Sequence, residues 1–252
     1  GMINMIKSEL YRMTKCKSFY LYWFAIIFTY AISIVTKSAG GIMLGIEVES
    51  AGKMDMQMVA MNFTFYFLFL FPVYSIVVSD FGEKTIKNTI SSAISRKTYI
   101  ASKFILTELF TMGSFVFCNI MFYVINSVIN GEKYTSAFSE YIKALLRQCP
   151  IMFTIVTLLV ALGFILRKMA LFNAITLLVP TIYTALAVSI YQAGAQKFAT
   201  EYLLKYELAT ALGKVAGNVS SNYYNNCIIA SCIVIVIAVF VSYNSFMKVE
   251  IK

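Results

Sequence analysis

The sequence predicts an all-α membrane protein, a single transmembrane domain over residues 1–252 with six membrane-spanning helices. Hydrophobic residues make up 60% of the chain and charged residues 13%, whereas a soluble domain has about 25% charged residues. Mean hydropathy is +0.76, and apolar runs long enough to cross a bilayer recur along the chain. In lipid, such runs satisfy their backbone polar groups only as helices.

The apolar runs give the expected spans in chain order, separated by more polar connections. Pro72 and Pro180 fall inside the second and fifth runs and predict kinks there, because proline lacks the N–H that a helix interior needs. The expected spans cover about residues 19–36, 58–78, 104–129, 148–166, 170–190 and 224–246.

The distribution of basic residues predicts the orientation. With six spans, the N-terminal segment, the second-to-third connection, the fourth-to-fifth turn and the C-terminal tail share one side of the membrane. These segments hold thirteen of the 21 Lys and Arg residues. By the positive-inside rule both termini are therefore cytoplasmic. The first connection on the opposite side carries three acids, which fit either a solvated outer loop or a surface that attracts a cationic substrate: Glu47, Glu49 and Asp55.

Three polar stretches have the apolar periodicity of helices at a membrane surface. The first precedes span one and predicts an N-terminal interfacial helix, with Ile3, Ile6, Leu10 and Met13 on one face. The second precedes span four, on the outer side, with Phe138, Tyr141, Ile142 and Leu145 on one face. The third lies within residues 191–222 and predicts a short helix at the outer leaflet, with Phe198, Tyr202, Leu203 and Tyr206 on one face and a Glu201–Lys205 pair on another.

Several kinds of chemistry are excluded or disfavoured by what the chain lacks. It contains no histidine, which removes Ser-His and Cys-His triads and HExxH zinc sites. The stretch "ALGKVAG" has neither the Ser/Thr nor the spacing of a phosphate-binding loop, so the chain does not hydrolyse ATP by that route. The five cysteines show no CxxC spacing and fit small buried hydrophobes better than metal ligands. We therefore expect no enzyme activity, metal site or nucleic-acid partner.

Polar residues inside the expected spans are candidates for a substrate pathway. Glu108 is the one acid within a span, where a charge is costly and therefore often functional. It also lies about a turn past Lys103, so pairing with a basic neighbour at the interface is the alternative. Asn119 and Asn126 fit either a polar pathway or hydrogen bonds between helices.

The connection between spans two and three, "SDFGEKTIKNTISSAISRKTYIASKF", is polar and basic but has helical periodicity. Ile86, Ile90 and Ile94 share one face of a short helix. Thr85 suits its N-terminus, and Arg96 suits the negative C-terminal end. Periodicity alone fits either a helix at rest on the membrane surface or a docking element for a soluble partner.

The residue order of this connection resembles the signature of ABC-2 type transporter permeases. Lys84 departs from that signature, because the family usually has glycine there. The N-terminal stretch "IKSELYRMTKCKSFYLYW" is also similar to that family's opening. The positions that carry the resemblance are the acid Asp80, the Thr-x-Lys-Asn element Thr85, Lys87 and Asn88, the Ile-Ser-Arg element Ile94, Ser95 and Arg96, and the closing Lys103.

The resemblance implies that this connection is a cytoplasmic coupling helix seated on a separate ATPase subunit. It implies two ATPase copies that carry ATP and magnesium, a second permease that is identical or closely related, and a bacterial cytoplasmic membrane. The expected function is export of amphipathic, antimicrobial or cytolytic peptides. The alternative is a motor-free immunity or scaffold protein that binds a peptide at the membrane. The expected coupling residues are Asp80, Thr85, Ile86, Lys87, Asn88, Ile90, Ile94 and Arg96.

Overall fold

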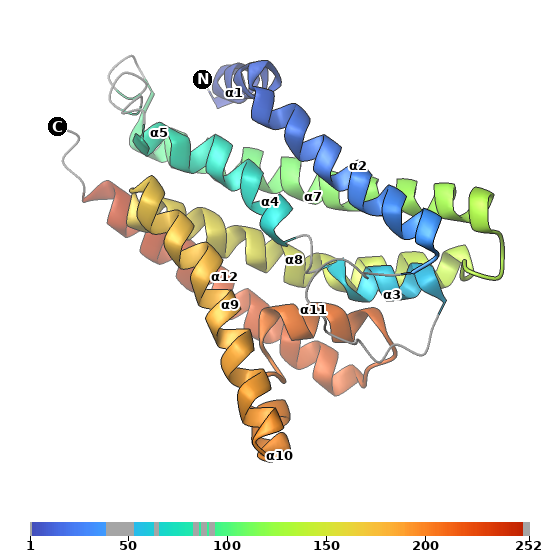
Figure 1. Ribbon diagram of the computed structural model, residues 1–252. Helices are drawn as coiled ribbons and strands as arrows, with labels where there is room; N and C mark the ends of the chain where they lie inside the picture. Colours follow the sequence, from blue (N-terminus) through green and yellow to red (C-terminus); the bar gives the residue numbers. More distant parts are fainter. Residues whose placement is uncertain are drawn as a thin grey trace.

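A computed structural model describes residues 2–38, 53–62, 66–82, 86, 90 and 94–248, and every regular element within these ranges is a helix. The expected coupling residues Thr85, Lys87 and Asn88 lie outside the described residues, as do Glu47 and Glu49. Figure 1 shows the described helices as an elongated bundle from which one helix diverges.

Five helices are long and apolar enough to cross a membrane, which confirms an all-α, multi-pass membrane protein. They match the first, third, fourth, fifth and sixth expected spans. Helix α9 continues through Pro180 as one element. The five are α2 (Lys17–Thr36), α7 (Arg96–Asn130), α8 (Phe138–Leu166), α9 (Met169–Gln192) and α12 (Ser221–Met247).

The second expected span is not one continuous helix. It divides into α3 (Met54–Ala60), α4 (Tyr66–Val73), the π-helix η2 (Tyr74–Val78) and α5 (Ser79–Gly82). Pro72 lies in α4 just before η2, so the predicted irregularity is present as a widened π turn. From α4 to α5 the chain crosses the bundle as a shorter apolar element.

The expected surface helices have different outcomes. Helix α1 (Met2–Lys15) forms as predicted before α2. The prediction of a separate helix before span four is wrong, because Phe138 begins α8 itself and that helix continues to Leu166. At about 1.5 Å per residue, α7 and α8 exceed the roughly 30 Å of a hydrocarbon core, so their ends extend beyond it.

The third surface stretch forms short helices after α9. These are α10 (Gln196–Phe198), the π-helix η3 (Ala199–Leu203) and α11 (Leu208–Ala216). Tyr202 and Phe198 stack at 5.6 Å on an exposed face. The predicted Glu201–Lys205 ion pair is absent among the described residues. A π turn changes the spacing, so residues four apart no longer lie above one another.

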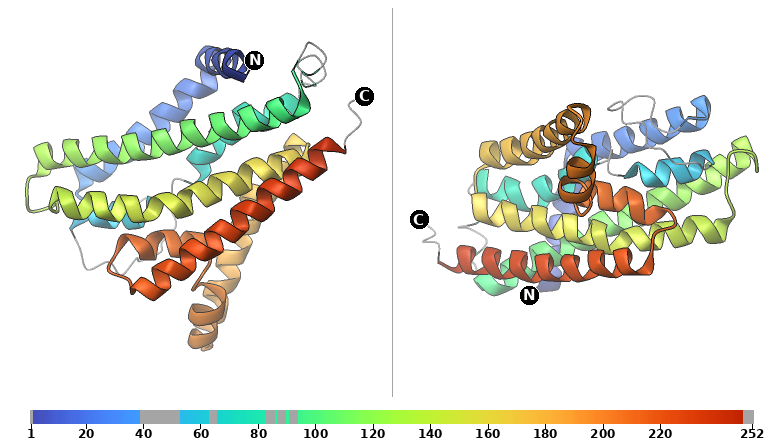
Figure 2. Two further views of the ribbon diagram at one scale, coloured as in Figure 1. Left: turned by 180° about the vertical axis from the view of Figure 1, so that it is seen from behind. Right: turned by 90° about the horizontal axis from the view of Figure 1, so that it is seen from below.

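Helix α8 is the centre of the bundle and contacts α7, α11 and α12. Figure 2 shows α7, α8 and α12 running side by side. The face of α8 toward its neighbours is apolar, with Ile151, Ile155 and Leu159 buried. Helix α9 diverges from this bundle (Figure 1) and exposes much of its apolar surface, as does α12, which suits contact with lipid.

Segments far apart in the sequence meet at one end of the bundle. Arg96, at the start of α7, donates to the Met247 carbonyl at 3.0 Å, and Arg167, after α8, donates to Ser245 Oγ at 2.9 Å. Helix α1 lies at the same end (Figure 1). We refer to this as the network end, because it holds the charged residues described next.

Candidate functional site

The network end contains four charged side chains from three helices, which we call the charge network: Glu9, Arg12, Asp80 and Lys103. Glu9 and Arg12 are three residues apart on α1 and therefore share a face, joined by a 2.7 Å ion pair. The apolar side chains Met5 and Met13 bury the same helix against the bundle. The polar face of α1 is thus held against α5 and α7.

Lys103 is the centre of the charge network and is fully buried. Its Nζ lies 2.5 Å from Asp80 Oδ2 and 3.0 Å from Glu9 Oε1, and it donates to the Ile76 carbonyl at 2.6 Å. An ammonium group has three hydrogens, so each has an acceptor. The two acids and two bases of the charge network balance in sign, which makes burial of these charges tolerable.

The π turn supplies backbone acceptors to both cations. Arg12 donates to the Ser75 carbonyl at 3.2 Å, and Lys103 donates to the Ile76 carbonyl. Ser75 and Ile76 both lie in η2, where the backbone pairing is i to i+5 instead of i to i+4. The π turn after Pro72 therefore contributes two backbone acceptors to the charge network.

Tyr99 connects the charge network to an aromatic cluster beneath it. Its hydroxyl donates to Asp80 Oδ2 at 2.7 Å, and its ring stacks on Phe246 of α12 at 5.6 Å. Phe164 of α8 packs edge-on against both rings, at 6.3 Å from Tyr99 and 5.2 Å from Phe246. The position of Asp80 is thereby linked to the ends of α8 and α12.

Asp80 remains a carboxylate although it is almost wholly buried. Burial alone would raise its pKa, but the Lys103 ammonium, hydrogen bonds from Lys103 and Tyr99, and the Arg12 guanidinium outweigh burial. The pKa of Asp80 is therefore below its ordinary value. Asp80 follows the apolar part of the second run and lies outside the span expected over residues 58–78.

The charge network brackets the connection that was expected to couple to an ATPase. Asp80 lies in α5, before the segment that links α5 to α7, and Lys103 lies in the second turn of α7, after it; both contact α1. Of the expected coupling residues on its apolar face, Ile86 is buried, and Ile90 and Ile94 are half-buried against the core of this chain. Arg96 contacts the end of α12.

The expected pathway residues Glu108, Asn119 and Asn126 share one buried face of α7. Glu108 Oε1 accepts a 2.6 Å hydrogen bond from Thr157 of α8, and no basic side chain pairs with it among the described residues. Lys103, the basic neighbour considered from the sequence, pairs instead with Asp80 and Glu9. Asn119 Nδ2 donates to the Phe115 carbonyl in its own helix. Asn126 Nδ2 donates to Thr135 Oγ1 in the turn before α8.

A second buried polar contact holds the opposite end of the bundle together. Gln148 of α8 accepts a 2.7 Å hydrogen bond from Asn62 and donates at 2.8 Å to the carbonyls of Val59 and Leu212. One amide therefore joins α8 to α11 and to the end of α3. Gly213 of α11 lies so close to α3 that a Cβ would be 3.0 Å from the Ala60 carbonyl oxygen.

Glu9, Arg12 and Tyr99 were not identified as site residues from the sequence. Arg12 contributed only to the count of basic residues, Asp80 was named only through the family signature, and Lys103 was named through that signature and as a neighbour of Glu108. The three-residue spacing of Glu9 and Arg12 predicts an ion pair on α1. The other partners of these two residues lie on α5 and α7, which the spacing does not reveal. No group of three metal-ligating side chains occurs in the described part of the chain.

No protein-family model matches the chain, and no curated protein matches its sequence. A function is therefore inferred from its own residues and structure.

Proposed function

We propose that this chain is the permease subunit of an ATP-driven exporter of the ABC-2 type in the bacterial cytoplasmic membrane. It moves amphipathic, antimicrobial or cytolytic peptides, and a separate ATPase subunit in two copies supplies the energy from ATP and magnesium. A second permease, identical or closely related, completes the membrane part. The residues expected to contact the ATPase lie in the connection between Asp80 and Lys103.

The observation that supports this proposal is the attachment of both ends of that connection to helix α1. Asp80 and Lys103 contact each other and the α1 residues Arg12 and Glu9 within 3.0 Å. A segment that receives force from a soluble motor needs a stiff base, since otherwise its motion would be lost in local bending. The charge network provides such a base, and Tyr99 links it to α8 and α12.

A motor-free immunity or scaffold protein is the alternative function. Its supporting observation is that Ile86 is buried within this chain, and Ile90 and Ile94 are half-buried there. This leaves less apolar surface for a partner than a free docking helix would offer. The two functions differ in whether an ATPase binds.

Co-purification distinguishes the two functions. The tagged chain is expressed in its native host and purified in mild detergent, and the retained ATPase is quantified. We expect Lys87→Glu to reduce ATPase retention, because it reverses a charge in the family signature. We expect Lys133→Glu, the same change on an exposed residue at the other end of the bundle, to retain ATPase as the wild type does.

Two results would count against the proposal. If the wild-type chain retains no ATPase while remaining monodisperse, the motor-free function is favoured. If Lys87→Glu and Lys133→Glu retain equal amounts of ATPase, the connection is not the docking site. Size-exclusion profiles of both variants show whether a loss of retention reflects misfolding.

A further inference from the structure

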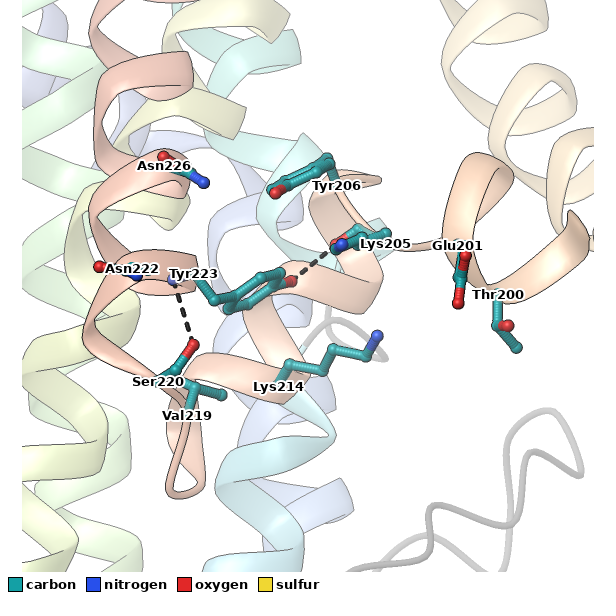
Figure 3. A pocket seen from close by; sticks show the side chains of 10 residues that line it. All are labelled: Thr200, Glu201, Lys205, Tyr206, Lys214, Val219, Ser220, Asn222, Tyr223 and Asn226. Atoms are coloured by element: carbon teal, nitrogen blue, oxygen red, sulfur yellow. Dashed lines mark hydrogen bonds between the residues drawn. The ribbon is translucent and has the colours of Figure 1, made fainter. Parts of the chain in front are cut away.

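A polar pocket of about 530 Å³ lies at the end of the bundle opposite the charge network. It is formed by η3, α11 and the first turns of α12, and Figure 3 shows its lining side chains. Tyr206 and Tyr223 form one wall, with rings stacked at 5.6 Å. Tyr223 is held in place because its hydroxyl donates to the Lys205 carbonyl at 2.7 Å. The wall is thus built from fixed aromatic side chains.

The charges and polar groups of the pocket favour an anion. Lys205 and Lys214 line it against one carboxylate, Glu201, and no carboxylate in the described part of the chain pairs with either lysine. In Figure 3, Lys214 extends toward the open side of the pocket and Glu201 lies across the gap. Hydrogen-bond donors are added by Asn222 and Asn226, one turn apart on α12. The N-terminal end of α12 contributes a further partial positive charge.

The position of the pocket along α12 fits the depth at which lipid headgroups lie. Helix α12 has 27 residues and so spans about 40 Å, with the charge network near its C-terminal end and the pocket at its N-terminal end. The polar residues Asn222 and Asn226 precede its apolar stretch. The neighbouring Tyr202, 74% exposed and stacked on Phe198, is typical of the aromatic belt at a membrane interface.

We propose that this pocket binds the phosphate-bearing headgroup of an anionic membrane lipid. Lys205 and Lys214 contact the phosphate, Asn222 and Asn226 donate to headgroup oxygens, and the Tyr206–Tyr223 wall packs against the glycerol part. The acyl chains then lie along the exposed apolar surface of α12. This inference does not depend on the proposed transport function.

Native mass spectrometry of the detergent-purified chain tests the proposal. Phosphatidylglycerol and phosphatidylcholine with identical acyl chains are titrated separately, and lipid adducts are counted. We expect phosphatidylglycerol to bind preferentially to the wild type, and the Lys205→Gln/Lys214→Gln double variant to bind it about tenfold more weakly through loss of two charge-assisted contacts. Glu201→Gln should bind it more tightly, because the one opposing charge is removed.

The matched control is Lys133→Gln/Lys143→Gln, which removes two exposed lysines outside the pocket and should retain wild-type binding. Equal phosphatidylglycerol binding by the two double variants would overturn the proposal, as would equal binding of the two lipids by the wild type. Competition by inorganic phosphate at concentrations equal to the lipid would instead assign the pocket to a soluble anion. Unchanged size-exclusion profiles and unfolding midpoints show that the variants remain folded.

Discussion

The Lys103 ammonium lies 2.5 Å from Asp80 Oδ2, and this buried ion pair joins α5 and α7, the helices on either side of the expected coupling connection. Both residues also contact α1, Asp80 through Arg12 at 2.7 Å and Lys103 through Glu9 at 3.0 Å. Because Lys103 is fully buried, its charge depends on these partners for compensation. The ion pair therefore connects α5 to α7, and its loss should lower the free energy of unfolding.

A double-mutant cycle measures the coupling energy between Asp80 and Lys103. Asp80→Asn and Lys103→Met should each lower the free energy of unfolding by about 3–5 kcal/mol, because each leaves a buried charge with fewer partners. The double variant should lose less than the sum, with a coupling of about 1–3 kcal/mol. Denaturant unfolding in detergent micelles gives these values. Lys97→Met, on an exposed residue in the first turn of α7, is the control, and additive effects of the Asp80 and Lys103 changes would mean that the pair is not coupled.

The stability from Asp80 should depend on pH in a defined direction. Its pKa is lowered in the folded protein, so the folded state favours the ionised form. The contribution is fully present above the ordinary aspartate value of 3.8 and is lost as the pH falls through the lower folded-state value. We expect the wild type to exceed Asp80→Asn in stability by a constant amount from pH 5 to 8 and by progressively less below about pH 4. A difference that already declines between pH 8 and 5 would contradict this assignment.

Hydropathy predicted the long helices because each lies in a continuous apolar run. Hydropathy did not predict the end of a helix where apolar residues continue past that end. Residues 58–78 are uncharged and mostly apolar, yet α3 separates from α4, and the π turn follows Pro72. The separate surface helix before span four failed for the opposite reason, since an amphipathic helix and an apolar helix join without an interruption at Gln148.

The charge network was less accessible to sequence reasoning, because its members come from helices separated by long stretches of chain. Asp80 was named only through a family signature, Lys103 was otherwise considered only as a partner for Glu108, and Tyr99 carries no charge that would have identified it. Gly213 was not identified as a contact residue from the sequence. Its close approach to the Ala60 carbonyl depends on α11, a helix that residues 191–222 did not reveal as a separate element.

Gln148 should be the main polar contact at the far end of the bundle. Gln148→Leu is similar in size but removes three hydrogen bonds and leaves Asn62 and two carbonyls without this partner. We expect a loss of about 3 kcal/mol in the free energy of unfolding. Gln192→Leu, on an exposed residue at the end of α9, should change it by less than about 0.5 kcal/mol. Equal effects of the two changes would show that the amide contributes little.

Glu108 can be tested for a structural role by a substitution that keeps its hydrogen bond. In Glu108→Gln the amide oxygen can still accept from Thr157, so stability should change by less than about 1 kcal/mol. Glu108→Leu removes the acceptor and should cost more. If an assembled Glu108→Gln complex hydrolyses ATP but no longer moves peptide, Glu108 acts in the pathway instead.

The orientation of the bundle determines which side of the membrane the two sites face. The positive-inside rule predicts that the network end faces the cytoplasm, where a soluble ATPase could reach it. Single cysteines at Lys133 and Ala195, in a background without the native cysteines, should therefore react with a membrane-impermeant thiol reagent on intact cells. A cysteine at Lys97, exposed at the start of α7, should react only after lysis. Labelling at Lys97 in intact cells, with none at Lys133, would reverse the orientation. The connection would then face away from any cytoplasmic motor, which would remove the basis for the proposed transport function, while the lipid pocket would move to the inner leaflet with its chemistry unchanged.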